Sequence, residues 1–166
     1  MKLLRMTGAD RAELLAALAS MPDFLTSSLG AVSVHEATVR GEDDTFSPVE
    51  QCWHLADLER EGYAVRIRRL LEEAAPQLPD FNGDRVAAER NYRALSLPEG
   101  LAAFRAARLA NLQRLRAVRP DQWTRAGTQE GVGAVSLCDV PAMMAAHDAS
   151  HRSEIEAWLR AREARS

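Results

Sequence analysis

The chain has 166 residues, a length typical of one domain that buries a core without disulfides, and we expect a single domain over residues 1–166. Hydrophobic residues make up 46% of the chain and charged residues 27%, a balance that excludes wholesale disorder. The formal net charge is -3 with acidic and basic residues interspersed, which argues against a nucleic-acid-binding protein.

The N-terminal part of the chain is expected to form two consecutive helical segments. Leucines recur at helical spacing over residues 10–19. Ser20 and Pro22 resemble the start signal of a second segment, which is expected to end near Gly30. Residues 31–46 show no periodicity and are expected to be irregular or briefly extended.

The second long helix has the clearest start signal. Ser47 and Glu50 have the spacing of a capping box, in which each side chain accepts a hydrogen bond from the other residue's backbone N–H. Helical periodicity then runs over residues 49–75, and prolines follow. We expect a loop at 76–83 and a short extra helix near 84–95.

The third long helix begins at a second capping-box pattern, Ser96 to Glu99, and Pro120 ends it. A glycine-containing loop follows. Ser136 and Asp139 are both possible caps of the last helix, and Asp139 is preferred because the nearby Pro141 fits only a first turn.

The last helix is expected to continue to about Arg162. Four amphipathic helices, one short extra helix and long connections together predict an all-α fold without a substantial sheet. We expect a four-helix bundle that is mainly antiparallel.

Two of the four histidines, His147 and His151, lie four residues apart on the last predicted helix. This spacing puts both imidazoles on one helix face, where they can bind one divalent ion. Both fall within the apolar stripe of that helix, where an unsatisfied polar group costs ~1–3 kcal/mol. The pattern favours either a shared metal or two separately hydrogen-bonded core histidines.

His54 lies on the second long helix, away from its main apolar ridge. If this helix neighbours the last one, His54 completes a three-histidine site with His147 and His151. Three protein ligands and an open position are typical of a catalytic metal.

The residues around these histidines resemble a known family. One helix reads Ser-Pro-x-Glu…Trp-His-Leu-x-Asp from Ser47, and the last reads His-Asp-x-x-His from His147. Over most of the chain, this arrangement resembles the DinB/YfiT-like superfamily of metal-binding four-helix bundles. The resemblance implies a metal triad of His54, His147 and His151, and a homodimer. It also implies a thiol-dependent transferase or isomerase, because members with known activity use low-molecular-weight thiols.

Carboxylates beside the triad are candidate catalytic groups. Asp57 follows His54 by one turn and Asp148 directly follows His147, so each could orient a ligand imidazole or accept a proton. Glu154 is a weaker candidate as a further ligand or base, with an ion pair to an arginine as the alternative. His35 is expected on the surface, outside the site.

Compartment and membrane association are also constrained by the sequence. No apolar run approaches the ~18–20 residues of a membrane span, and charges near the N-terminus disfavour a secretory signal. Cys52 and Cys138 are too far apart to form a metal or redox motif. We therefore expect a cytoplasmic protein with neither membrane nor nucleic acid as a partner.

The leading hypothesis is a metal-dependent thiol S-transferase that acts on small electrophiles through a metal-bound thiolate. The cofactor would be a divalent ion such as zinc, nickel, iron or manganese, and a low-molecular-weight thiol the co-substrate. A metal-dependent hydrolase of a small molecule is the first alternative. A zincin-type hydrolase is disfavoured because Asp148 stands where that motif has glutamate. The second alternative is a non-catalytic dimeric stress or ligand-binding protein with a structural metal.

Overall fold

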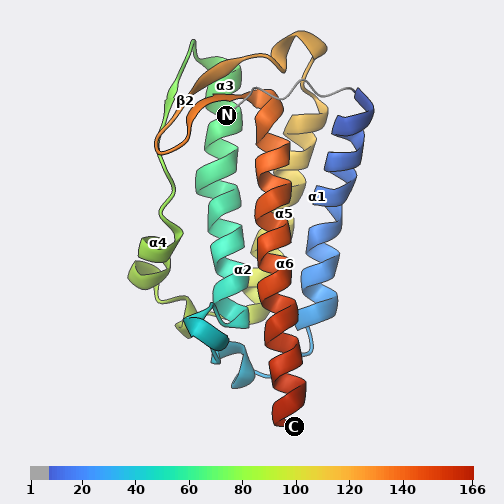
Figure 1. The fold of residues 1–166 in the computed structure, drawn as a ribbon, viewed down its shortest axis with the longest axis vertical. Coiled ribbons are helices and arrows are strands. Elements are labelled where there is room, and N and C mark those ends of the chain that lie inside the picture. The colour runs from blue at the N-terminus through green and yellow to red at the C-terminus, as the bar shows by residue number, and fades with distance from the viewer. Residues whose placement is uncertain (1–7) are drawn as a thin grey trace.

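The computed structural model describes residues 8–166 and forms a four-helix bundle, as predicted (Figure 1). Within this range, no helix combines the length and the apolar character needed to cross a bilayer. The four long helical segments are α1 (Gly8–Leu29), α2 with α3 (Pro48–Asp57 and Ala64–Glu72), α5 (Leu97–Arg116) and α6 (Val140–Arg165).

The helices do not alternate strictly in direction. Figure 1 shows α1 and α6 running one way and α2, α3 and α5 the other. Consecutive pairs α1/α2 and α5/α6 are therefore antiparallel, as expected. In contrast, α3 and α5 run the same way because the connection at 73–96, which contains α4 (Gly83–Arg90), returns along the bundle.

The two regions predicted as loops contribute a small sheet at one end of the bundle. Strand β1 (Gln77–Leu78) pairs in parallel with β2 (Ala126–Gln129), which pairs antiparallel with β3 (Gly133–Ser136). These strands were missed because they are too short to show a period. Gly131 and Gly133 adopt positive φ at the hairpin turn, a conformation that glycine adopts without strain.

The predicted break in the first helix is wrong, because α1 continues through Pro22. A proline inside a helix has no N–H to donate to the carbonyl four residues earlier, which here is that of Leu18. The Arg108 guanidinium donates to the Leu18 carbonyl oxygen at 2.9 Å instead. Pro22 is buried in the core, so tertiary contacts compensate for the lost backbone bond.

The second long helix runs without a break from Pro48 to Glu72, three residues short of its predicted end. Its middle part, Leu58–Tyr63, is a π-helical turn. The predicted capping box at its start is confirmed: the Ser47 hydroxyl accepts from the Glu50 N–H, and the Glu50 carboxylate accepts from the Ser47 N–H. Glu59, within the π-helical turn, is 1% exposed.

The start of α6 differs from the prediction. Asp139 precedes the helix, but its side chain makes no cap hydrogen bond to α6. Its carboxylate instead accepts from the backbone N–H of Ser136 at 2.8 Å, so the capping box surrounds a 3₁₀ turn over Leu137–Asp139. The helical path therefore begins one turn earlier than predicted, and α6 ends at Arg165 rather than Arg162.

One buried arginine on α5 bonds to all three other helical segments. Arg108 is 1% exposed and donates to Glu59 in the π-helical turn, to Asp148 on α6 and to the Leu18 carbonyl on α1. Asn111, one turn later on α5, also donates to the Glu59 carboxylate at 2.7 Å. The buried charges are therefore paired and hydrogen-bonded, as burial requires.

Replacing Arg108 with methionine should destabilise the fold by about 3–5 kcal/mol, because Glu59 and Asp148 would remain buried without a counter-charge. Urea unfolding measures this loss. Arg105→Met is the matched control, because Arg105 lies on the same helix in an exposed ion pair with Asp23 and should cost about 0–1 kcal/mol. Equal losses in the two variants would show that the buried network does not stabilise the bundle.

Candidate metal centre

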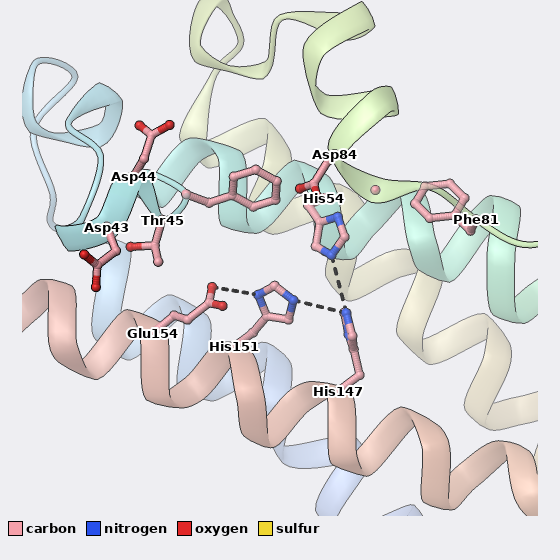
Figure 2. Close-up of a pocket in the computed structure, with 11 residues that line it drawn as sticks. Asp43, Asp44, Thr45, His54, Phe81, Asp84, His147, His151 and Glu154 are labelled. Carbon is pink, nitrogen blue, oxygen red and sulfur yellow. Dashed lines mark hydrogen bonds and ion pairs between the residues drawn. The ribbon is translucent and has the colours of Figure 1, made fainter. Parts of the chain in front are cut away.

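The three histidines named from the sequence converge between α2 and α6 (Figure 2). The Nε2 atom of His147 lies 3.4 Å from Nε2 of His54 and 3.1 Å from Nε2 of His151. His54 and His151 are 7% and 8% exposed, and His147 is half-buried. Side chains from residues nearly a hundred positions apart therefore meet at one point.

The donor set fits a divalent ion. Two nitrogens bound to one tetrahedral ion at about 2.0–2.1 Å are about 3.3 Å apart, close to the separations found here. All three histidines offer a ligand atom within 4.8 Å of the others, and they form the only such group of histidine, cysteine or acidic residues in the described part of the chain. Imidazole is a ligand for zinc, nickel and iron alike, so the donors do not choose among these metals.

The orientation of the His151 ring is set by Gln51 and Glu154. The Gln51 amide nitrogen donates to the Glu154 carboxylate at 2.7 Å, because a carboxylate can only accept. The Gln51 carbonyl oxygen therefore faces His151 and accepts from its Nδ1–H at 2.6 Å. With the proton on Nδ1, the Nε2 lone pair is free to bind an ion.

The surroundings keep two of the imidazoles neutral. Burial, reinforced by the neighbouring His151, lowers the pKa of His54 to about 4 and that of His147 to about 3. The hydrogen bond from His151, opposed by burial and assisted by Gln51, lowers the pKa of Glu154 to about 2. Neutral imidazole is the form that binds metal, so this environment favours coordination at neutral pH.

The His54 ring lies against Gly83, the first residue of α4. A Cβ at position 83 would lie 2.5 Å from Cε1 of His54, so only glycine leaves room for the ring. The Nδ1 atom of His54 is buried and has no hydrogen-bond partner within residues 8–166. The start of α4 therefore shapes one side of the centre.

A cavity of about 430 Å³ opens next to the triad. Phe46 and Phe81 provide apolar walls on either side of His54. The remaining lining comes from the segment before α2, the start of α4, and α6: Asp43, Asp44, Thr45, Gly83, Asp84, His147, His151 and Glu154. A small molecule can therefore reach the three nitrogens.

The two predicted catalytic aspartates lie beside the triad, but neither lines the cavity. The Asp57 carboxylate accepts from the Tyr92 hydroxyl and from Arg60 and Arg90. These bonds outweigh the effect of burial and lower the pKa of Asp57. Both oxygens of Asp148 accept from Arg108, at 2.7 and 2.8 Å.

Residues that the sequence reading missed complete the site. Gln51 precedes His54 by three residues, nearly one turn, and that spacing was an available signal. Gly83 and Asp84 had no signal in the sequence, because only the fold brings α4 to His54.

Glu154 is in the cavity, but its partners are Gln51 and His151 rather than an arginine. His35 lines a different cavity with Arg162.

Comparison with known proteins agrees with this structure. A family model described as the DinB superfamily matches residues 7–155, so the chain belongs to that superfamily. The structure is similar to that of YfiT from Bacillus subtilis, described as a probable metal-dependent hydrolase with an unusual four-helix bundle topology. The TM-score is 0.88 at 15% sequence identity, over 98% of this chain and 94% of the YfiT chain. A search of curated proteins finds no match.

Alanine at His54, His147 or His151 should each abolish most binding of a divalent ion, because two imidazoles hold an ion far more weakly than three. Metal content after dialysis against one equivalent of zinc measures the loss. His35→Ala is the control and should keep full occupancy. If the His54 variant binds as much metal as the parent protein, then only the helical pair on α6 holds the ion.

Replacing Gln51 with leucine should weaken metal binding about 10- to 100-fold, because His151 would lose the acceptor that fixes its tautomer. Competition with a chromophoric chelator measures the affinity. Gln113→Leu, at an exposed position on α5, is the matched control and should leave the affinity unchanged. An unchanged affinity in the Gln51 variant would contradict the assigned role of this residue.

Proposed function

We propose that this member of the DinB superfamily is a metal-dependent enzyme that acts on a small molecule. One observation carries the proposal: three imidazole Nε2 atoms converge at the wall of a cavity of about 430 Å³. Three protein ligands next to an accessible space are typical of catalytic metal sites, whereas structural sites are closed by a fourth protein ligand. Ligand pockets of small-molecule sites have about this volume.

The residues of the site have different proposed roles. His54, His147 and His151 would hold the ion, and Gln51 keeps the Nε2 atom of His151 unprotonated. A bound divalent ion supplies Lewis acidity, which lowers the pKa of a thiol or water that reaches it. We assign Asp57 and Asp148 a positioning role, because arginines and a tyrosine occupy their oxygens.

We propose thiol transfer as the reaction, with a low-molecular-weight thiol as co-substrate. The chain cannot supply this thiol itself, because Cys52 and Cys138 are both buried and neither lines the cavity. Burial also raises the pKa of the Cys52 thiol to about 12, which keeps it protonated and unreactive. We assign the proton of the entering thiol to water that enters the cavity, because the lowered pKa of Glu154 makes its carboxylate a weak base.

Hydrolysis is the second candidate. A bound ion would also lower the pKa of a water that enters the cavity, with no need for a thiol. The similar YfiT structure, described as a probable metal-dependent hydrolase, also supports this alternative. The two reactions differ in one requirement, since only transfer depends on an added thiol.

A purely structural metal is less well supported. The bundle has two large apolar clusters that do not include the three histidines. The buried Arg108 network further links all four helical segments without a metal. The stability of the fold therefore has sources other than an ion.

We also propose a homodimer in a reducing cytoplasm. The two buried, unpaired cysteines support a reducing compartment. The dimer rests on the family resemblance. A role in a stress response is compatible with thiol chemistry.

Removing the metal should leave the helices intact. Stability should fall only by the linkage contribution, ~2.7 kcal/mol when the free metal is at 100 times its dissociation constant. Circular dichroism and urea unfolding, with and without chelator, measure this. Complete unfolding on chelation would favour the structural metal.

Product formation from a generic electrophile, such as an aryl halide, should require both metal and added thiol. Zinc-loaded protein should consume the electrophile at least tenfold faster with thiol than without it, and His147→Ala should abolish the difference. Consumption of an ester at equal rates with and without thiol would instead assign the site to hydrolysis. If the loaded protein catalyses neither reaction, the enzymatic proposal fails.

A further inference from the structure

The charges around the cavity all have the same sign. Of the eleven residues that line it, four carry an ionisable carboxyl group, and none within residues 8–166 is a lysine or arginine. The four acidic residues come from three separate parts of the chain: Asp43 and Asp44 precede α2, Asp84 is in the first turn of α4, and Glu154 is on α6. The negative charge therefore surrounds the opening.

Most of this charge is not neutralised by the protein. Asp44 is paired with Arg40 at 2.9 Å. Glu154 accepts from the Gln51 amide at 2.7 Å and lies 3.4 Å from Nδ1 of His151, which as a metal ligand would be a neutral imidazole. In the described part of the chain, neither Asp43 nor Asp84 has an ion-pair partner. A divalent ion on three neutral histidines would add two positive charges. These do not offset the carboxylates of Asp43, Asp84 and Glu154, none of which pairs with a lysine or arginine in residues 8–166.

These carboxylates are too dispersed to bind a second ion together. The histidine triad is the only group in residues 8–166 whose ligand atoms are close enough for metal binding. Separated carboxylates instead act on a ligand through their combined field, which a low-dielectric cleft strengthens. Such a field attracts an extended cation and repels an anion.

From these observations we propose that the site selects small molecules that carry a positive charge, such as a protonated amine, over neutral and anionic ones. The inference rests on the proposed function and narrows its substrate class. If the co-substrate is a thiol, it is an aminothiol without excess negative charge. An anionic thiol would place its carboxylate against Asp84 or Asp43.

Three thiols of matched size test this selection: cysteamine is cationic, 2-mercaptoethanol neutral and 3-mercaptopropionate anionic. The visible spectrum of cobalt-loaded protein reports the affinity of each. Because the three thiol groups differ in acidity, the informative quantity is the change in each affinity from parent protein to variant. The intrinsic acidity cancels in that ratio.

All three thiols would bind as thiolates, so the change for 2-mercaptoethanol measures the effect on the thiolate alone. Relative to that change, the Asp43→Asn/Asp84→Asn double variant should weaken cysteamine binding about tenfold and strengthen 3-mercaptopropionate binding by a similar factor. Asp80→Asn, an exposed position outside the cavity but near α4, is the control and should change none of the three. The selectivity should also shrink as salt is raised from low to physiological ionic strength.

Equal changes for all three thiols in the double variant would overturn the inference while leaving thiol binding intact.

If no thiol alters the cobalt spectrum, the transferase proposal fails. The charge selectivity of the cavity is then tested with metal ligands of another class. Histamine, 4-methylimidazole and imidazole-4-acetate form the same charge series. Preferential weakening of histamine in the double variant would support a cation-selective site, and equal weakening would overturn it.

Discussion

The bundle depends on the buried contacts of Arg108. Its guanidinium bonds Glu59 in the π-helical turn that follows α2, and Asp148, the neighbour of His147 on α6. The same side chain therefore holds together the two helical segments that carry the three histidines. A planar guanidinium can bond both oxygens of Asp148 and still reach Glu59 and the Leu18 carbonyl, whereas a lysine ammonium has only three donors. The position of the histidine centre thus follows from a contact that involves no histidine.

A bound metal ion would give the imidazole nitrogens of the three histidines a common partner that the protein does not provide. Gln51 fixes the proton of His151 on Nδ1, so the Nε2 atom of His151 carries a lone pair that is directed at Nε2 of His147. A neutral His147 ring has one N–H, so from Nε2 it can donate that proton to His151 or to His54, and burial opposes a second proton by lowering the pKa of His147 to about 3. A cation among the three nitrogens would instead accept a lone pair from each ring. The acidic residues around the opening, Asp43 and Asp84 among them, then determine what kind of molecule can approach.

Much of this was readable from the sequence because it depends on local chemistry. Capping boxes and helical periodicity located the long helices, and the spacing of His147 and His151 identified the pair on one face. Features that depend on distant contacts were not readable. The continuity of α1 through Pro22 requires a donor ninety residues away at Arg108, and the contact of Gly83 with His54 requires the long return of the chain between α3 and α5. The small sheet was missed because strands of two to four residues show no period.

The central claim is that three histidines bind one ion and leave one of its coordination positions open to a ligand. X-ray absorption spectroscopy on zinc-loaded protein tests this claim most directly. The account predicts about three imidazole nitrogens and one further light atom around zinc. Addition of cysteamine should replace the light atom with a single sulfur at about 2.3 Å while the three imidazoles remain. A shell with a sulfur before any thiol is added would contradict the account, because Cys52 and Cys138 lie outside the site. A fourth protein nitrogen or carboxylate that persists with thiol present would contradict the open position.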